Sequence, residues 1–226
     1  MSRNIAALFI IGLFMACNSP SEKNETVSET PEKETSEVKT PEIPEGFVEI
    51  DSEEARIATA LMAAPEEDRA NCTVLGYNDA GEFVTLKEGT NEFICIADDP
   101  NKQGFNAACY HKDLEPFMAR GRELRKEGKS GGEVFNIREE EAKAGKLDMG
   151  KPGSTLHIYF GSQTVYNPET SVVAGAKYRY VVYLPFATSE STGLPEKPIA
   201  PNHPWIMNPG THRAHIMISP INEDPE

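Results

Sequence analysis

The residues best suited to chemistry gather in one C-terminal stretch, residues 203–217. Three of the five histidines lie there, His203, His212 and His215, together with Met217 and Trp205, the only tryptophan of the chain. Imidazole and thioether ligands together suit copper, whereas imidazole alone suits zinc. The stretch therefore forms a candidate ligand or metal site, with copper or zinc as the ions to consider.

The same stretch has a simpler interpretation as packed structure. In a strand, His215 and Met217 share one face, but His212 and His215 point to opposite faces. Pro209 and Gly210 disfavour the helix that would bring those two histidines together. We therefore expect His215 to be packed and hydrogen-bonded beneath a surface lined by Trp205, and metal binding is the alternative.

An envelope hydrolase is a second alternative, and it depends on hydroxyl groups in a polar loop. Ser189, Ser191 and Thr192 follow a predicted strand, and a nucleophile there would need a positioned base and an oxyanion site. The chain contains neither a GxSxG elbow nor an HExxH motif. No catalytic residue is predicted, and we expect a protein that binds rather than catalyses.

Four cysteines are present, Cys17, Cys72, Cys95 and Cys109. An oxidising compartment allows one disulfide among the last three, with three alternative pairings. We expect the Cys95–Cys109 bridge, because residues 98–104 between them have the composition of a loop without packing of its own. Closing a loop of about 15 residues contributes roughly 3 kcal/mol in the chain-entropy model. Cys72 is then expected to be a buried free thiol.

The first seventeen residues predict where the protein resides. Arg3 precedes an apolar run over residues 5–15, which ends at Ala16 and Cys17. This is the layout of a signal peptide over residues 1–16, and the run is too short for a roughly 20-residue bilayer span. A cysteine directly after the cleavage site is typical of a bacterial lipoprotein, whose fatty-acylated thiol anchors it to the membrane. Asn18 is not the aspartate that retains many lipoproteins at the inner membrane, which favours the outer membrane.

The composition after Cys17 changes twice. Residues 17–44 are rich in Glu, Pro, Ser and Thr, and they are expected to form a disordered acidic tether. Residues 45–226 are enough for one domain with a core of its own. The formal net charge of −14 argues against a nucleic-acid partner, which needs a basic surface. The expected partners are the membrane through the lipid anchor, and an unidentified small ligand or envelope protein.

The hydrophobic pattern predicts an α+β domain, a single antiparallel sheet packed against two or three helices. A helix is expected to follow Asp51, with Asp51 as its cap and Glu54 completing a capping box. Three successive antiparallel strands are expected within residues 72–96, the first two joined by the turn at 78–81. Further helices are expected at 113–126 and 134–146, and strands at 155–160, 177–184 and 214–218.

Several phrases in this order resemble an uncharacterised family of secreted or envelope bacterial proteins. They lie at residues 57–65, 73–75, 86–91, 113–118, 204–211 and 214–218, and include Pro204-Trp205-Ile206-Met207 and Ala214-His215-Ile216-Met217-Ile218. The resemblance covers residues 55–219 and implies one coherent domain, with no activity to carry over. Cys72, His203 and His212 lie outside the pattern, which favours His215 as the single functional histidine. We therefore expect a binding surface around residues 195–215 and the adjacent sheet edge.

Overall fold

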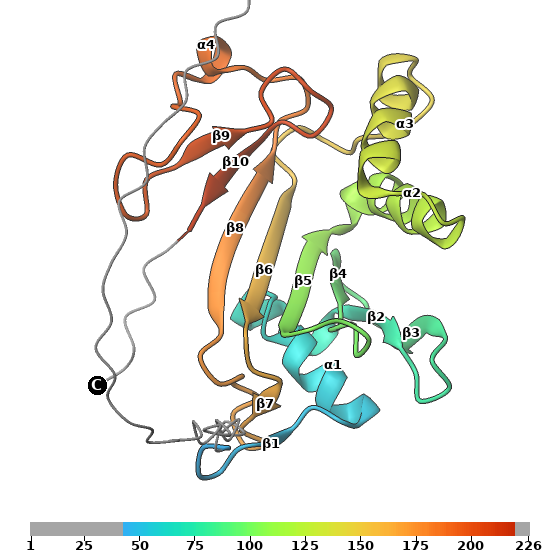
Figure 1. Ribbon diagram of the computed structural model, residues 1–226, viewed down its shortest axis with the longest axis vertical. Helices are drawn as coiled ribbons and strands as arrows, with labels where there is room; N and C mark the ends of the chain where they lie inside the picture. Colours follow the sequence, from blue (N-terminus) through green and yellow to red (C-terminus); the bar gives the residue numbers. More distant parts are fainter. Residues whose placement is uncertain (1–42, 220–226) are drawn as a thin grey trace, which may run out of the picture. The chain divides into compact units, whose positions relative to one another are not determined.

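The structure, a computed structural model, describes residues 43–219. Within them, an eight-stranded sheet has the order β3-β2-β4-β5-β6-β8-β10-β9, and a small sheet pairs β1 with β7 (Figure 1). The strands are β1 (Val48–Glu49), β2 (Thr73–Tyr77), β3 (Phe83–Lys87), β4 (Phe93–Ile96), β5 (Phe105–His111), β6 (Thr155–Gly161), β7 (Val165–Tyr166), β8 (Lys177–Tyr183), β9 (Trp205–Met207) and β10 (His215–Ile218). The helices are α1 (Glu53–Leu61), α2 (Glu115–Lys126), α3 (Gly131–Lys143) and α4 (Ser189–Thr192), with 3-10 turns at Glu66–Asn71 and Lys112–Leu114.

This architecture confirms the predicted α+β class. The predicted signal peptide, Cys17 and nearly all of the tether lie outside the described residues, so the structure does not test those predictions. Among residues 43–219, no helix is both long enough and apolar enough to cross a bilayer.

One strand pair differs from the expected antiparallel order. β2 and β3 form the predicted hairpin, whose turn is held by the Asn78 side chain accepting from the backbone N–H groups of Ala80 and Glu82. β4 does not continue beside β3 but pairs with β2 in parallel. The connection returns because the backbone N–H groups of Thr90 and Asn91 both donate to the carbonyl of Asn71, just before β2 begins. β4 therefore starts at the same end of the sheet as β2.

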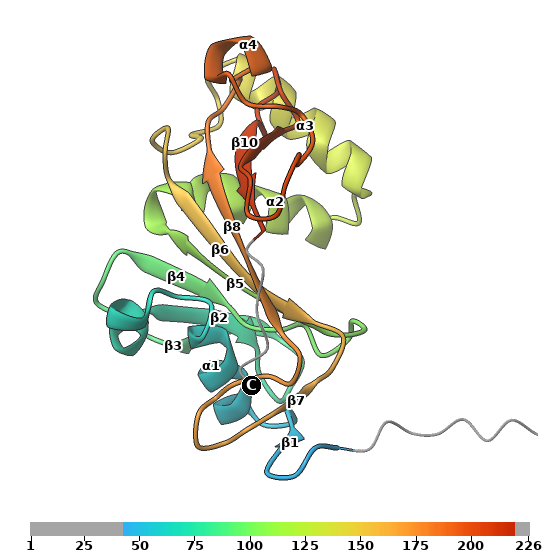
Figure 2. The same cartoon turned by 90° about the vertical axis from the view of Figure 1, so that its left-hand side faces the viewer.

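The sheet has a core on each face. Side chains alternate along a strand, and Cys95, Ala107 and Cys109 belong to the cluster that packs with Ala60 and Ala63 at the end of α1. Their neighbours Ile94, Ile96 and Tyr110 belong to the opposite cluster, which includes Leu114, Phe117, Val181 and Met217. α1 lies near the end where β5 begins, and α2 and α3 lie near the end where it finishes (Figures 1 and 2).

Helix ends follow local side-chain chemistry, with one correction to the expected caps. α1 is capped by Ser52, whose Oγ accepts from the N–H of Ala55, and not by Asp51 with Glu54. α3 begins three residues earlier than expected, because Ser130 and Glu133 form a capping box there.

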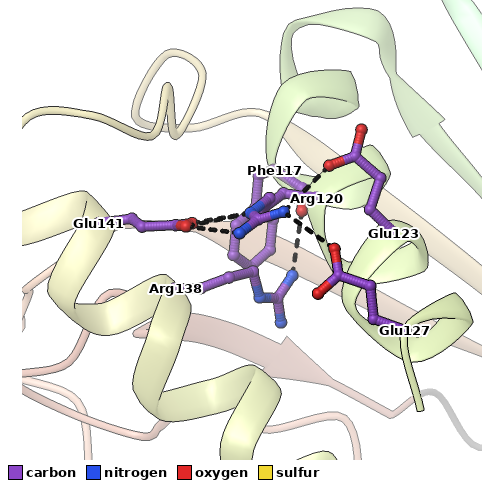
Figure 3. Close-up of polar contacts among 6 residues, drawn as sticks. All are labelled: Phe117, Arg120, Glu123, Glu127, Arg138 and Glu141. Atoms are coloured by element: carbon purple, nitrogen blue, oxygen red, sulfur yellow. Dashed lines mark hydrogen bonds and ion pairs between the residues drawn. The ribbon is translucent and has the colours of Figure 1, made fainter. Parts of the chain in front are cut away.

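α2 and α3 are held together by two arginines (Figure 3). Arg120 of α2 makes a bidentate contact with Glu141 of α3 and an ion pair with Glu123 on its own helix. The buried Arg138 of α3 lies with its guanidinium carbon 4.0 Å from the centre of the Phe117 ring and donates to the Phe117 carbonyl. The surface pairs are screened by water, whereas the Arg138 contact is not.

Gly121 gives Arg138 the space for this contact, which leads to a double-mutant prediction. A Cβ at position 121 would lie 2.9 Å from Nη1 of Arg138. Gly121→Ala should therefore destabilise the wild-type protein, although Ala is normally favoured over Gly in a helix by about 0.5–1 kcal/mol. In the Arg138→Ala background the same change should stabilise it, with a coupling of about 1–3 kcal/mol in urea unfolding. Additive effects would show that the two positions do not compete for space.

Candidate functional site

A groove of about 640 Å³ opens beside the edge strand β9, in the region expected to bind. Three of the predicted residues line it, His203, Trp205 and Met217. The other lining residues are Arg179, Pro198, Ile199, Ala200, Pro201, Asn202, Met207 and Ser219. Its volume falls within the range of small-molecule sites. The groove thus lies within the predicted surface at residues 195–215 and extends onto β8 and β10.

The sheet register places the groove residues on one face. Met217 of β10 lies opposite Trp205 of β9 and Val181 of β8, and His215 lies opposite Met207. Arg179 is two residues before Val181, so it shares that face. Ile199, 72% exposed, contributes to the wall formed by residues 198–203. Most of the lining is apolar, and large apolar groups exposed around a concave surface mark a binding site.

Two polar groups in the groove have unused hydrogen-bonding capacity. The Arg179 guanidinium stacks over Phe160, 4.7 Å from the ring centre, and its Nε is buried without a hydrogen bond. His203 Nδ1 is also buried without a partner. Among residues 43–219, no carboxylate forms an ion pair with Arg179. Within residues 43–219, the groove therefore combines an apolar lining with a cation that forms no ion pair.

The other two predicted histidines do not line the groove. His215 shares the groove face but is 3% exposed, and its Nδ1 lies 2.6 Å from the carbonyl oxygen of Arg213. Burial lowers the pKa of His215, which keeps the ring neutral in the packed state. This placement matches the packed, hydrogen-bonded state expected for His215.

His212 lies in a different environment, fully buried against α3. Its Nδ1 is 2.6 Å from Oε2 of Glu139, which also accepts from the His212 backbone N–H. Burial lowers the pKa of His212, and the Glu139 hydrogen bond acts in the opposite direction. The rings of Phe117 and Phe135 enclose the imidazole. In the described part of the chain, His203, His212 and His215 do not gather into a metal site.

The hydroxyl groups considered for hydrolysis have structural partners. Ser189 Oγ donates to Glu196, Ser191 takes part in the capping box of α4, and Thr192 donates to the Thr188 carbonyl. None of the three hydrogen-bonds to a histidine within residues 43–219. Within residues 43–219, none of these three hydroxyl groups is therefore paired with a histidine base, and the hydrolase alternative gains no support from them.

A cluster of three buried thiols forms a second candidate site, which the sequence did not predict. The sulfur atoms of Cys72, Cys95 and Cys109 lie within 4.8 Å of one another, and all three residues have 0% exposure. Cys72 directly precedes β2, Cys95 lies in β4, and Cys109 faces it from β5. These three cysteines could hold a metal ion. Periodicity predicted β2 and β4 but not β5, which carries Cys109, and the pairing that brings Cys72 to Cys95 is the parallel one that the pattern missed.

The groups around Cys72 lower the pKa of its thiol, although its Sγ also lies at hydrogen-bond distance, 3.2 Å, from the Asp68 carbonyl, which accepts from the protonated thiol. Hydrogen bonds with Cys109 and Cys95 lower the pKa of Cys72 to about 3, and burial opposes them. The Asn91 amide and the positive charge of Lys87 also lower this pKa. The pKa of Cys109 is raised by its hydrogen bonds with Cys72 and Cys95 and by burial. For Cys95 the hydrogen bond with Cys109 lowers the pKa, but the hydrogen bond with Cys72 and burial outweigh it, so this pKa is raised as well. Lys87 is fixed nearby by donating to the carbonyls of Ala70 and Cys72.

Comparison with known proteins gives no further assignment, since no family model, curated protein or solved structure matches this chain. The two sites must therefore be interpreted from their own geometry.

The Cys95–Cys109 disulfide stays a prediction, and the strand pairing is compatible with it. The two sulfurs are 2.8 Å apart and the thiols are free in this structure. The Lys112 N–H donates to the Glu92 carbonyl, so these two residues form a hydrogen-bonded pair. Hydrogen-bonded and non-hydrogen-bonded pairs alternate along an antiparallel ladder, and Cys95 and Cys109 lie three positions further on, so they form a closely spaced, non-hydrogen-bonded pair.

Denaturing mass spectrometry of the isolated protein should show a loss of two hydrogens that maps to Cys95 and Cys109, with Cys72 free to be alkylated. Alkylation of all three cysteines without reductant would refute the bridge.

Proposed function

We propose that this protein is a non-catalytic ligand-binding domain, carried in the cell envelope on a lipid anchor. The observation that supports binding is the groove beside β9, whose lining is mostly apolar and whose Arg179 forms no ion pair with the described residues. The ligand that fits this combination is a small molecule with an apolar body and one carboxylate or phosphate group.

Charge complementarity supports the anionic group. A partly buried guanidinium without a partner is unfavourable, because it loses hydration without gaining an ion pair. An anion in the groove would supply charge-assisted hydrogen bonds to the guanidinium of Arg179, which lines it. Stacking on Phe160 restrains the plane of the guanidinium, which lowers the entropy cost of forming those hydrogen bonds.

The apolar body has a complementary surface in Trp205, Met207 and Met217. Thioether and indole side chains adapt to ligands of different shape and contribute large contact areas. Met207 is 37% exposed at the groove, so its burial by a ligand would remove apolar surface from water.

Ligand binding can be followed by tryptophan fluorescence, because Trp205 is the only tryptophan and lines the groove. Dodecanoate, below its micellar concentration, should change the emission in a saturable way with one molecule bound per chain. Arg179→Gln should weaken this binding by about tenfold or more, as expected for a lost charge-assisted hydrogen bond.

Two controls make this test specific. Lys177→Gln removes an exposed positive charge two residues away on the same strand and should leave the affinity nearly unchanged. Dodecylamine has the same chain with the opposite charge and should bind much more weakly. Equal binding of the amine, or an Arg179→Gln affinity equal to that of the wild type, would overturn the assignment.

The envelope location is part of the proposal and rests on residues 1–17. The fatty-acylated Cys17 would anchor the domain, with the acidic tether as a spacer, and the outer membrane is the favoured destination with the domain facing the periplasm or the surface. Cys17→Ser should move the protein from the membrane fraction to the soluble fraction after cell lysis. Continued sedimentation of the variant with membranes would mean that another feature holds it there.

Metal binding is the second candidate function, with copper or zinc as the ion. The three buried thiols favour it, whereas the histidines first considered are divided between the groove and the core. Elemental analysis of protein isolated under anaerobic conditions tests this candidate. Stoichiometric copper or zinc in the chains whose cysteines are reduced is the expected result, and metal-free reduced protein would remove this candidate.

A further inference from the structure

We infer that the cluster of Cys72, Cys95 and Cys109 is a site for monovalent copper, Cu(I), bound by sulfur alone. This inference rests on the second candidate function and specifies the ion and its ligands. It assigns a role to Cys72, which the groove does not use.

The ligand set is soft and comes from three separate segments. Thiolates select soft ions such as Cu(I), and the sulfurs converge because β4 lies between β2 and β5. The three cysteines belong to a buried cluster that includes Ala60, Ala63 and Ala107, and none of the three is exposed to solvent.

The coordination number distinguishes copper from zinc. A structural zinc ion almost always takes four ligands in a tetrahedron. In the described residues, no histidine or acidic side chain joins the three sulfurs as a fourth ligand. His157 lies opposite Cys109 across β5 and β6, but its ring hydrogen-bonds to the backbone of Ala63. With the site fully buried, water is also a poor fourth ligand, whereas Cu(I) needs only two or three thiolates.

The cluster has partial compensation for the negative charge of its thiolates. Lys87 provides one positive charge, held by hydrogen bonds to two backbone carbonyls beside Cys72. The Asn91 side chain donates both to the Asp68 carbonyl and toward the sulfur of Cys72, at 3.7 Å. Both groups lie next to Cys72, so they would compensate negative charge on this sulfur when an ion is bound.

Copper loading and a Cys95–Cys109 disulfide exclude each other, because they use the same sulfurs. Two sulfurs bound to one ion at about 2.3 Å cannot remain 2.8 Å apart in a trigonal site, so Cys95 and Cys109 must separate by roughly 1 Å on loading. The reduced protein is therefore the form that takes up copper.

The test is a titration of the full-chain protein with Cu(I) under anaerobic conditions. The protein is first reduced with a phosphine, and bicinchoninate serves as the competing, coloured ligand. One Cu(I) per chain should be withheld from bicinchoninate, and an excess of Zn²⁺ should not displace it. Protein whose Cys95–Cys109 bridge is left intact should withhold none.

Two serine variants give matched controls, since each removes one of the four cysteines. Cys72→Ser removes one of the three ligands and should weaken Cu(I) binding by more than about tenfold. Even the loss of a residue that only hydrogen-bonds to a ligand weakens metal binding on this scale. Cys17→Ser should leave it unchanged, and Trp205 emission verifies that both variants are folded. Tighter binding of Zn²⁺ than of Cu(I) would overturn the copper assignment but keep a metal site. Failure to withhold either ion would remove the metal function as well.

Discussion

The register of the eight-stranded sheet is the constraint on which both sites depend. Because side chains alternate between the faces, shifting one strand by a single residue would exchange all its buried and exposed groups. The pairing of β4 with β5 places Cys95 opposite Cys109 on the face covered by α1. The pairing of β10 with β8 and β9 places Met217 between Val181 and Trp205 on the other face. One sheet thereby supports a closed thiol cluster and an open groove.

The two sites differ in the contacts that surround them. The thiols lie where α1 closes over the sheet with small side chains, and no water-accessible surface remains. The groove lies at the edge strand β9, where Trp205 and Met217 also belong to the cluster that includes Phe117 of α2. Sheet edges are normally protected from pairing with another chain. Here the edge is accompanied by the loop of residues 198–203, which turns it into one wall of a concave surface.

The sequence was sufficient for elements whose signals are local. The hairpin at Asn78 and the helix of residues 113–126 follow from turn chemistry and from apolar spacing, and both are present. A binding surface around residues 195–215 was predicted from the shared strand face of His215 and Met217, and the groove lies in that region, where Met217 of β10 is opposite Trp205 of β9. Contacts between distant segments carry no such signal. Nothing near Cys72 indicates that β4 will pair with β2 in parallel, and nothing near His212 indicates Glu139, 73 positions earlier.

Arg179 was missed for the same reason. In the sequence it is one residue of a strand rich in tyrosine and valine, and only the pairing with β6 brings it over Phe160.

A crystal structure of the chain with dodecanoate would show directly whether the groove holds an anionic amphipathic ligand. We expect the alkyl chain to lie against Trp205 and Met217, with the carboxylate hydrogen-bonded to Arg179. A ligand bound elsewhere, or one whose carboxylate points away from Arg179 into solvent, would contradict it.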